Sequence, residues 1–320
     1  MKFYTSVLPY RGRLLVRGVD KDGTQKKYRI NYKPSLFVPV GKETKYKTLD
    51  GRYVERIKFD SMPEATKWVN EYKNVTNFEY FGNTRHQYPF IADEFKGKID
   101  WDMNKIKLLT IDIECESENG FPSPEKADQP LICITVKDHT TKKIIVFGMG
   151  NFVNDREDVQ YINCVTETGL VETFTKFWVE YNPDIITGWN VKFFDIPYLM
   201  NRFRYLMGDE WLNQFSPWGI VEQKSASVLF ASREQQVWNI MGVDTLDYLD
   251  LYRKFTFVRR ESYKLDYIGE VELGQNKLDN PYDTFKEFYS NDYQRFVEYN
   301  IQDVELVDKL EDKLQLIALF

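Results

Sequence analysis

The sequence predicts an α/β protein with a mixed β-sheet, preceded by a smaller α+β domain. One observation is a strand-like run at Lys107–Cys115, and a second is the mixture of short strand patterns and helical patterns that follows it. The third is charge: residues 1–110 contain 22 Lys and Arg against 13 Asp and Glu, whereas the rest contain 21 against 36. We therefore expect two domains, residues 1–105 and residues 106–320.

Residues 1–105 have the pattern of short strands with one clear helix. Asp20–Gly23 is a turn between two strand-like runs. The helix begins near Ser61, with Pro63 in its first turn and Glu64 placed for a capping box. Its apolar positions recur at helical spacing, so we expect it to pack on a sheet; they are Ala65, Trp68, Val69 and Tyr72.

Basic residues of this first domain are interleaved with aromatic side chains, among them Tyr28, Tyr32, Tyr46 and Tyr53. Such a surface can contact phosphates and stack on bases. The same mixture is also typical of an ordinary solvated surface, so both interpretations stay open.

The run Lys107–Cys115 alternates strictly between its two faces. Asp112 and Glu114 share one face, while Ile111 and Ile113 share the other, and the bulky neighbours favour an inner strand. Two carboxylates on an apolar strand are costly unless a cation neutralises them. Their hard oxygen atoms favour magnesium or manganese. An edge strand with a solvated acidic face is the alternative.

The remaining elements are expected to complete the mixed sheet and its helical layers. In chain order they are strands at Leu131–Lys137 and Lys143–Gly148 with a turn at His139–Thr141, a helix at Glu167–Glu180, a strand at Ile185–Gly188, a helix at Ile196–Met207, a hairpin within Val228–Met241 that turns near Ser232–Glu234, and a long helix from about Asn291.

Asp195 stands where the loop after Ile185–Gly188 enters the next helix, and Pro197 follows in the first turn. The simpler interpretation is an N-terminal cap, because such an aspartate accepts hydrogen bonds from free backbone amides. The loop also places Asp195 near the carboxyl edge of the sheet, where α/β proteins form their sites.

Asp303 belongs to the apolar stripe of the final helix, which contains Phe296, Val307, Leu310 and Leu314. A carboxylate on the buried side of a helix needs a partner. Tyr299 precedes Asp303 by four residues, so both side chains lie on roughly one face.

Asp112, Glu114, Asp195 and Asp303 therefore come from three segments, and we expect their carboxylates to converge. So many acids cannot share a site without cations. Two magnesium ions about 3.5–4 Å apart, which manganese can replace, would neutralise them.

The three acidic segments also carry a family resemblance. Asp112-Ile113-Glu114, the stretch Trp189–Tyr198 around Asp195, and Tyr299 with Asp303 resemble, in this order and spacing, the three exonuclease motifs of family B DNA polymerases. More narrowly, nearly the whole chain is similar to the amino-terminal third of the replicative polymerases of T-even-type bacteriophages. That wider likeness includes Tyr32–Phe37, Gly120–Pro122 and Leu246–Tyr252.

The resemblance implies a ribonuclease-H-like fold and 3′–5′ proofreading hydrolysis of single-stranded or mismatched DNA, with primer–template DNA as the partner. It also implies that Asp112, Asp195 and Asp303 bind the metals, and that Glu114 binds a metal or holds the attacking water. Tyr299 would orient that water, since a phenol with a pKa of about 10 is a poor general base.

Five further residues are candidates for contact with the DNA strand. Phe121, in a Gly-Pro loop, is expected to stack on terminal bases, and Phe194 is expected either to do the same or to pack in the core. Asn190 is a candidate to hydrogen-bond the substrate or its own loop. Lys277 resembles a family lysine near the scissile phosphate, and Arg233 lies in a segment similar to the family's strand-separating hairpin.

The chain lacks the Ser-Leu-Tyr-Pro-Ser and Asp-Thr-Asp stretches of family B polymerase sites, and Asp244–Asp247 differs from the latter in spacing. The polymerase part is therefore expected either to have been removed from a shortened chain or to be a separate chain. Two rival functions stay open. One is a nucleic-acid-binding module whose first domain binds RNA or single-stranded DNA, and the other is a structural half that docks a separate polymerase chain.

Composition limits the remaining classes of function. Cys115, Cys133 and Cys164 show no paired or metal-type spacing, which suits a reducing cytoplasm, that of the host if the chain is viral. We find no signal peptide and no apolar run long enough to span a membrane. His86 and His139 alone do not make a multi-histidine zinc site.

Overall fold

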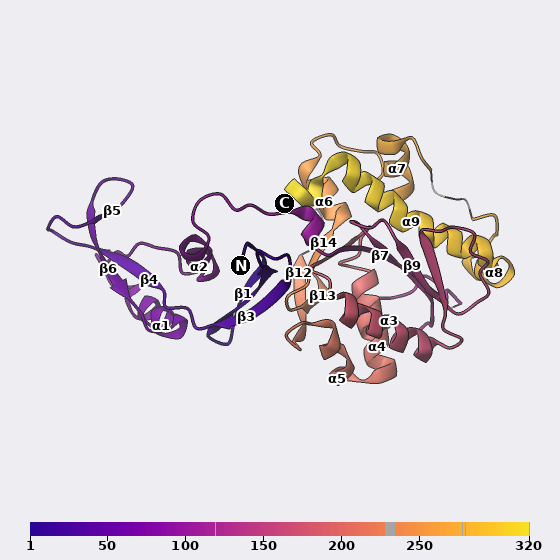
Figure 1. The fold of residues 1–320 in the computed structure, drawn as a ribbon, viewed down its shortest axis with the longest axis horizontal. Coiled ribbons are helices and arrows are strands. Elements are labelled where there is room, and N and C mark those ends of the chain that lie inside the picture. The colour runs from indigo at the N-terminus through magenta and orange to yellow at the C-terminus, as the bar shows by residue number, and fades with distance from the viewer. Residues whose placement is uncertain (119, 228–233, 277, 279, 320) are drawn as a thin grey trace. The chain divides into compact units, whose positions relative to one another are not determined.

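The computed structural model describes residues 1–118, 120–227, 234–276, 278 and 280–319. It divides into two compact units, Met1–Lys105 and Ile106–Phe320. Each unit has its own sheets and its own apolar core, so each is described by itself (Figure 1).

The first unit contains two small antiparallel sheets and two helices. One sheet has the order β1-β2-β3 and the other the order β4-β6-β5. The bounds are β1 Phe3–Tyr10, β2 Arg13–Val19, β3 Gln25–Ile30, β4 Ser35–Pro39, β5 Tyr46–Lys47, β6 Tyr53–Lys58, α1 Met62–Tyr72 and α2 Gln87–Glu94.

Helix α1 begins next to its predicted cap. The Ser61 side chain accepts a hydrogen bond from the Glu64 backbone N–H at 3.2 Å. The predicted capping box is wrong, however, because the Glu64 carboxylate accepts from the Asp60 N–H at 2.7 Å and not from the cap residue. The helix packs on the second sheet as expected, with Ala65 buried and the Trp68 ring 5.6 Å from that of Phe59.

The second unit is built on a six-stranded sheet of order β10-β9-β8-β7-β11-β14. Strand β8 runs antiparallel to both β7 and β9, while the pairs β10–β9, β7–β11 and β11–β14 are parallel. The α/β architecture with a mixed sheet is therefore confirmed, and β7 is an inner strand. The bounds are β7 Leu108–Cys115, β8 Leu131–Asp138, β9 Ile144–Gly148, β10 Val159–Asn163, β11 Ile185–Gly188 and β14 Asp244–Asp247.

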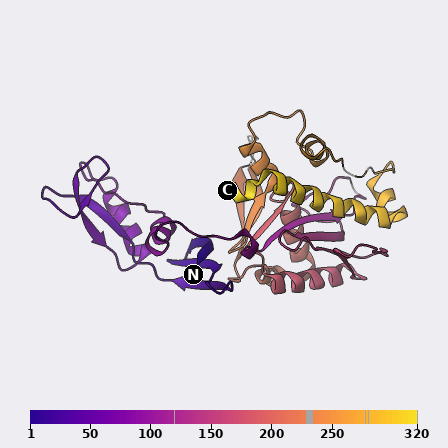
Figure 2. The same cartoon turned by 45° about the horizontal axis from the view of Figure 1, so that its top comes forward.

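Helices cover both faces of this sheet (Figures 1 and 2). On one face, α3 (Glu167–Tyr181) and α4 (Asp195–Met207) pack over the main apolar core. On the other face, α8 (Phe285–Asn291) and α9 (Tyr293–Leu314) pack over a second core. The other helical segments of this unit are α5 Asp209–Leu212, η2 Asn213–Phe215, α6 Tyr248–Phe255, α7 Leu265–Leu273 and α10 Leu316–Leu319, whereas η1 Met103–Lys105 ends the first unit.

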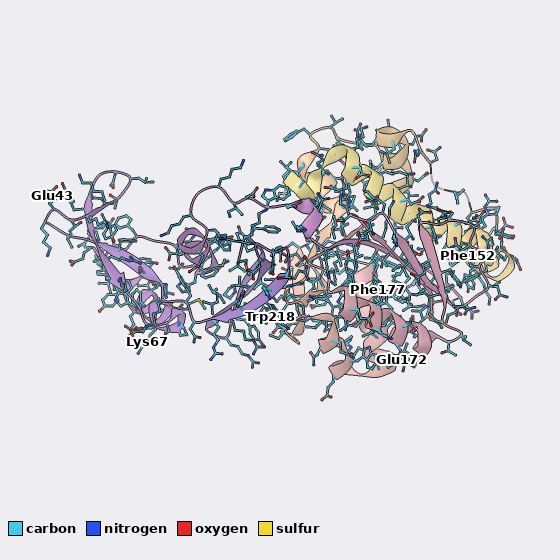
Figure 3. The ribbon with its side chains drawn as sticks, viewed as in Figure 1. Glu43, Lys67, Phe152, Glu172, Phe177 and Trp218 are labelled. Carbon is cyan, nitrogen blue, oxygen red and sulfur yellow. The ribbon has the colours of Figure 1, made fainter. Side chains whose placement is uncertain are left out.

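Aromatic rings fill much of the core between α3 and the sheet. Phe177, labelled in Figure 3, has its ring centroid 5.5 Å from that of Phe147 on β9 and stacks on Tyr181 at the same distance. Phe174, one turn earlier, is fully buried beside them. The apolar side chains of this helix therefore form the face that packs on the sheet.

The hairpin predicted within Val228–Met241 has its second arm in the structure, and the strand paired with that arm begins before the predicted range. Strand β12 (Val221–Ser227) pairs with β13 (Glu234–Ile240), whereas residues 228–233 lie outside the described residues. Most side chains of β12 are polar and exposed, so hydrophobic alternation gives no signal there.

The final helix starts within two residues of its predicted start at about Asn291. Helix α8 ends at Asn291, and α9 begins at Tyr293, with the Asp292 side chain accepting from the Arg295 N–H at 3.1 Å. Asp292 therefore separates α9 from α8, a helix that the sequence pattern did not predict. None of the helices in the described part of the chain is both long enough and apolar enough to cross a membrane.

Candidate active site

Strand β7 presents its two carboxylates toward helix α9. Asp112 lies opposite Thr135 of β8 and Glu114 lies opposite Cys133, which packs in the core under α9. The alternate residues Ile111 and Ile113 are buried in the core on the opposite face. The predicted alternation of the strand is therefore what points both acids to one side of the sheet.

Helix α9 supplies the third carboxylate. Asp303 is buried, and oxygen atoms of Asp112, Glu114 and Asp303 lie within 4.8 Å of one another. Asn300, one turn earlier, donates from Nδ2 to Oδ2 of Asp112 at 2.6 Å. These contacts join residues that are far apart in the sequence. Three hard oxygen donors at such separations suit a divalent cation.

Asp195 is placed differently from the other three acids. It is 4% exposed, and its Oδ1 accepts a hydrogen bond from the Ile113 N–H at 3.2 Å. The pKa of Asp195 is raised to about 7, mainly by burial and in smaller part by the nearby carboxylates of Asp247 and Asp303, while the hydrogen bond from Ile113 opposes this rise. Asp195 is not in the group within 4.8 Å.

One hollow contains all four of these acids. Its volume is about 640 Å³, and segments from β7, the loop after it, the start of α4 and helix α9 line it. Among its lining residues are Asp112, Glu114, Phe121, Asn190, Phe194, Asp195, Tyr299 and Asp303. All the predicted site residues that fall among the described residues therefore border a single space.

The aromatic candidates differ in exposure. Phe121 is 87% exposed, and its ring centroid lies 5.5 Å from that of Phe194, with 48° between the ring planes. Phe194 also stacks on Tyr198 at 5.9 Å and packs against the main core. Phe194 therefore packs against the core and also borders the hollow, whereas its stacking on terminal bases stays a prediction.

Tyr299 borders the same hollow from helix α9. Its ring packs edge-on against Phe285 and Phe288, at 6.4 and 5.9 Å between centroids. A second hollow has a volume of about 460 Å³ and shares the lining residues Asp112, Trp189, Tyr299 and Asp303 with the first.

The sequence interpretation missed two residues of the site. Asn300 was given no role, although it lies three residues before Asp303 on the buried side of the helix, where a fully buried amide signals a polar partner. Trp189 lines both hollows, and its indole N–H donates to the Tyr263 carbonyl oxygen at 3.0 Å. Two other candidates, Arg233 and Lys277, lie outside the described residues.

A second group of possible metal ligands is paired with lysine side chains of the protein. His139, Asp308 and Asp312 offer ligand atoms within 4.8 Å of one another. The ammonium group of Lys142 lies 3.0 Å from Asp308 and 2.9 Å from Asp312, and that of Lys137 lies 3.0 Å from Asp308. These ammonium groups neutralise the carboxylates, so this group serves structure and not metal binding.

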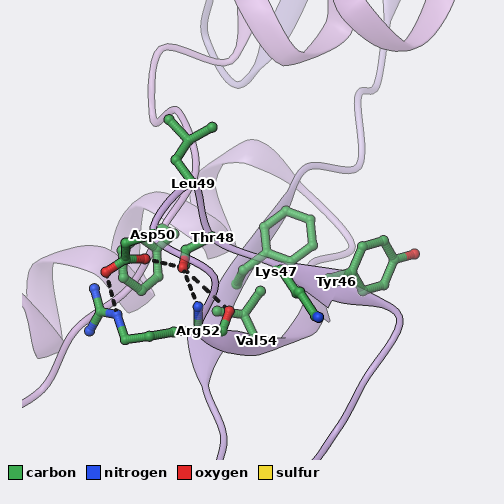
Figure 4. Close-up of a pocket in the computed structure, with 9 residues that line it drawn as sticks. Tyr46, Lys47, Thr48, Leu49, Asp50, Arg52 and Val54 are labelled. Atoms are coloured by element: carbon green, nitrogen blue, oxygen red, sulfur yellow. Dashed lines mark hydrogen bonds and ion pairs between the residues drawn. The ribbon is translucent and has the colours of Figure 1, made fainter.

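The first unit has an open, mainly apolar hollow of about 490 Å³ around Tyr46 and Arg52 (Figure 4). The Thr48 hydroxyl bonds to Asp50, and the Arg52 N–H donates to the Thr48 oxygen at 3.0 Å. Arg52 also lies over the Phe81 ring and pairs with Glu79 at 2.6 Å. Opposite charges thus compensate one another here, and nucleic-acid contact by this unit stays a prediction.

Comparison with known proteins decides the family. The model of the DNA polymerase family B exonuclease domain matches residues 64–268. This chain belongs to that family. The ribonuclease-H-like fold expected for the exonuclease domain agrees with the mixed sheet and its two helical layers.

Two phage polymerases match almost the whole chain. The DNA-directed DNA polymerase of Escherichia phage RB69 is 31% identical over 99% of this chain, and that of Enterobacteria phage T4 is 29% identical over 97%. The DNA polymerase delta catalytic subunit of Caenorhabditis elegans is 30% identical over 66%. The resemblance to the phage polymerases is therefore confirmed. The family B chain described here spans 38% and 37% of the length of the two phage relatives.

Proposed function

We propose that this chain removes nucleotides one at a time from the 3′ end of DNA, as the proofreading portion of a DNA polymerase. The observation that carries the proposal is the convergence of Asp112, Glu114 and Asp303 within 4.8 Å in a chain of the family B exonuclease domain. The polymerase part would act with it, in the same chain or in another.

The donor set fits magnesium, and Asp112, Glu114, Asp303 and the adjacent Asp195 are the residues that would hold two such ions. When bound, magnesium or manganese supplies a hydroxide-like nucleophile near neutral pH and stabilises the leaving 3′ oxygen. Asn300 fixes the rotamer of Asp112 through its 2.6 Å hydrogen bond, so that ligand is positioned before any cation binds.

The other residues of the hollow orient the reactants. The Tyr299 hydroxyl would hold the attacking water, because its ring is fixed by Phe285 and Phe288 beside the acidic group. The exposed ring of Phe121 and the half-buried ring of Phe194 offer a stacking surface for terminal bases of any sequence. Substrate preference then follows from access, because a paired terminus must first separate to reach the acids.

The proposal is tested by hydrolysis of labelled primers whose 3′ ends are single-stranded, mismatched or fully paired. Single-stranded and mismatched ends should be cut faster, because separating a terminal pair costs a few kcal/mol and least for a mismatch. A chelator should abolish cleavage, and magnesium or manganese should restore it. The Asp112→Ala/Glu114→Ala double variant is the matched control for a contaminating nuclease.

Equal rates on matched and mismatched ends would count against proofreading. Cleavage that survives both excess chelator and the double substitution would overturn the proposed site. Binding of single-stranded DNA with no hydrolysis under any metal condition would instead favour the rival function, a nucleic-acid-binding module.

A further inference from the structure

The loop that leads from β11 to Asp195 is fastened to the neighbouring strand by one buried carboxylate. Asp247 ends β14 and is 4% exposed. Its Oδ1 accepts from the Asn190 N–H at 3.2 Å, and its Oδ2 accepts from the Lys192 N–H at 3.0 Å. Both amides belong to the loop between the strand and helix α4.

The same carboxylate also caps helix α6. Its Oδ1 accepts from the N–H groups of Leu249 at 3.0 Å and Asp250 at 3.3 Å. Four backbone amides from two separate segments therefore converge on Asp247. An ordinary N-terminal cap would explain only the two amides of the helix.

The loop needs an anchor because its backbone is unusual. Asn190 has a φ of +67°, a left-handed conformation that non-glycine residues rarely adopt, and its carbonyl oxygen accepts from the N–H groups of Phe193 and Phe194. Before the loop, Gly188 has no room for a side chain, since a Cβ would lie 2.5 Å from the Ile111 carbonyl oxygen. Hydrogen bonds from outside the loop can hold such a turn in place.

The Asn190–Phe194 loop contains residues of the candidate active site. Asn190 and Phe194 border the 640 Å³ hollow, and Asp195 follows directly at the start of α4. A shift of the loop would move the stacking ring and the Asp195 carboxylate together. Displacements of about 1 Å in a catalytic arrangement can lower a rate about a hundredfold.

We propose that Asp247 is a positioning residue for the exonuclease site, which it serves by anchoring the Asn190–Phe194 loop and not only by capping helix α6. The inference rests on the proposed function for its effect on hydrolysis. Its effect on the loop itself does not depend on any activity.

Asp247→Ser separates the two roles. Serine is a good N-terminal cap, so its hydroxyl can serve Leu249 and Asp250, but it is too short to reach the loop amides. The matched control is Thr166→Ala, which removes the cap of α3, where the threonine oxygen accepts from the Gly169 N–H at 3.1 Å. Both variants are measured at a temperature at which each is fully folded.

The first readout is hydrogen exchange of the peptide segment 189–194. Asp247→Ser should raise its deuterium uptake, while Thr166→Ala should leave it unchanged. The second is hydrolysis of a single-stranded 3′ end, which should fall about 10- to 100-fold for Asp247→Ser and stay at the wild-type rate for the control. Asp247→Asn, which puts an amide group against the Lys192 N–H, should show the same two effects.

The other possible results of these two measurements would each contradict one of the proposals. Unchanged exchange at 189–194 in Asp247→Ser would overturn the anchor. Increased exchange with an unchanged rate of hydrolysis would overturn the positioning role of Asp247 in the exonuclease site. If the wild-type chain proved inactive on every 3′ end, the proposed function would fail. Hydrogen exchange would still decide whether Asp247 anchors the loop.

Discussion

At the scale of single residues, the acidic group works through partners that fix its geometry. Asp112 has Asn300 as a donor and Asp195 has the backbone of Ile113. Oriented carboxylates lose less entropy when a cation binds, and their rotamers stay those that the cation needs. Neighbouring residues that touch neither water nor DNA therefore contribute to the proposed chemistry.

The first prediction concerns Tyr299→Phe. The ring contacts with Phe285 and Phe288 remain, so the melting temperature should hardly change. Loss of one hydrogen bond to the attacking water should cost roughly 1–3 kcal/mol, about a ten- to hundredfold fall in the rate of hydrolysis. Single-turnover kinetics on a single-stranded 3′ end measures this fall.

Asp303→Ala is the comparison for that experiment. It removes a carboxylate of the acidic group and should reduce the rate far more than Tyr299→Phe does. Binding of single-stranded DNA should change little in Tyr299→Phe, because the hydroxyl contacts water and not the strand. An unchanged rate would withdraw the water-orienting role from Tyr299.

At the scale of elements, helix α9 has two tasks. Its middle carries Asn300 and Asp303 at the site, and one turn later Asp308 fastens it to the β8–β9 hairpin. The Asp308 carboxylate lies 3.0 Å from the Lys137 and Lys142 ammonium groups and 2.8 Å from His139 Nδ1. Burial alone would raise the pKa of Asp308, but these hydrogen-bonded partners outweigh it and hold the pKa at about 2.

Low pH should therefore weaken the attachment of α9 to the β8–β9 hairpin through Asp308. A carboxyl group with a folded-state pKa of about 2 and an ordinary value of 3.8 stabilises the fold fully above about pH 4. As the pH falls from about 4 to about 2, roughly 2 kcal/mol of that stabilisation should be lost. Urea unfolding of the wild type and of Asp308→Asn across this pH range isolates the contribution of Asp308, since only the wild type has its carboxyl group.

Near neutral pH, Asp308→Asn should lower the free energy of unfolding by about 3 kcal/mol, because it leaves the buried Lys137 without its counter-charge. The matched control is Asp312→Asn, which removes the exposed partner of Lys142 and should cost less than about 1 kcal/mol. Equal effects of the two substitutions would show that burial does not govern this network.

At the scale of the whole molecule, the proposed cations should couple to stability. Asp112, Glu114 and Asp303 repel one another when ionised, so a cation that binds only the folded chain should stabilise it. At about a hundred times its dissociation constant, such a ligand adds about 2.7 kcal/mol. The melting temperature should therefore rise on addition of magnesium or manganese and fall back with a chelator.

The Asp112→Ala/Glu114→Ala variant tests the origin of that rise. It should show no metal-dependent shift, and without metal it should melt no lower than the wild type, because two repelling acids are gone. A metal-dependent shift of equal size in this variant would place the cations elsewhere in the chain.

Much of the fold follows from patterns between neighbouring residues. Alternation along β7 is enough to put Asp112 and Glu114 on one face, and helical spacing is enough to put Tyr299 and Asp303 on one side of α9. These patterns depend on backbone geometry alone, so they can be read from the sequence without knowing which segments pack on them. The ordered acidic motifs then indicate the family, which the comparisons confirm.

Other features depend on contacts between segments far apart in the chain. Asn300 reaches Asp112 across 188 residues, and Asp247 binds amides of the loop that holds Asn190, 57 residues away. The pairing of β12 with β13 also lacks a hydrophobic pattern, because most β12 side chains face solvent. Residue types and local spacing therefore determine which acids the site contains. Only packing of the sheet, α9 and the Asn190–Phe194 loop decides how those acids are held, since hydrogen bonds between distant segments leave no periodic trace in the sequence.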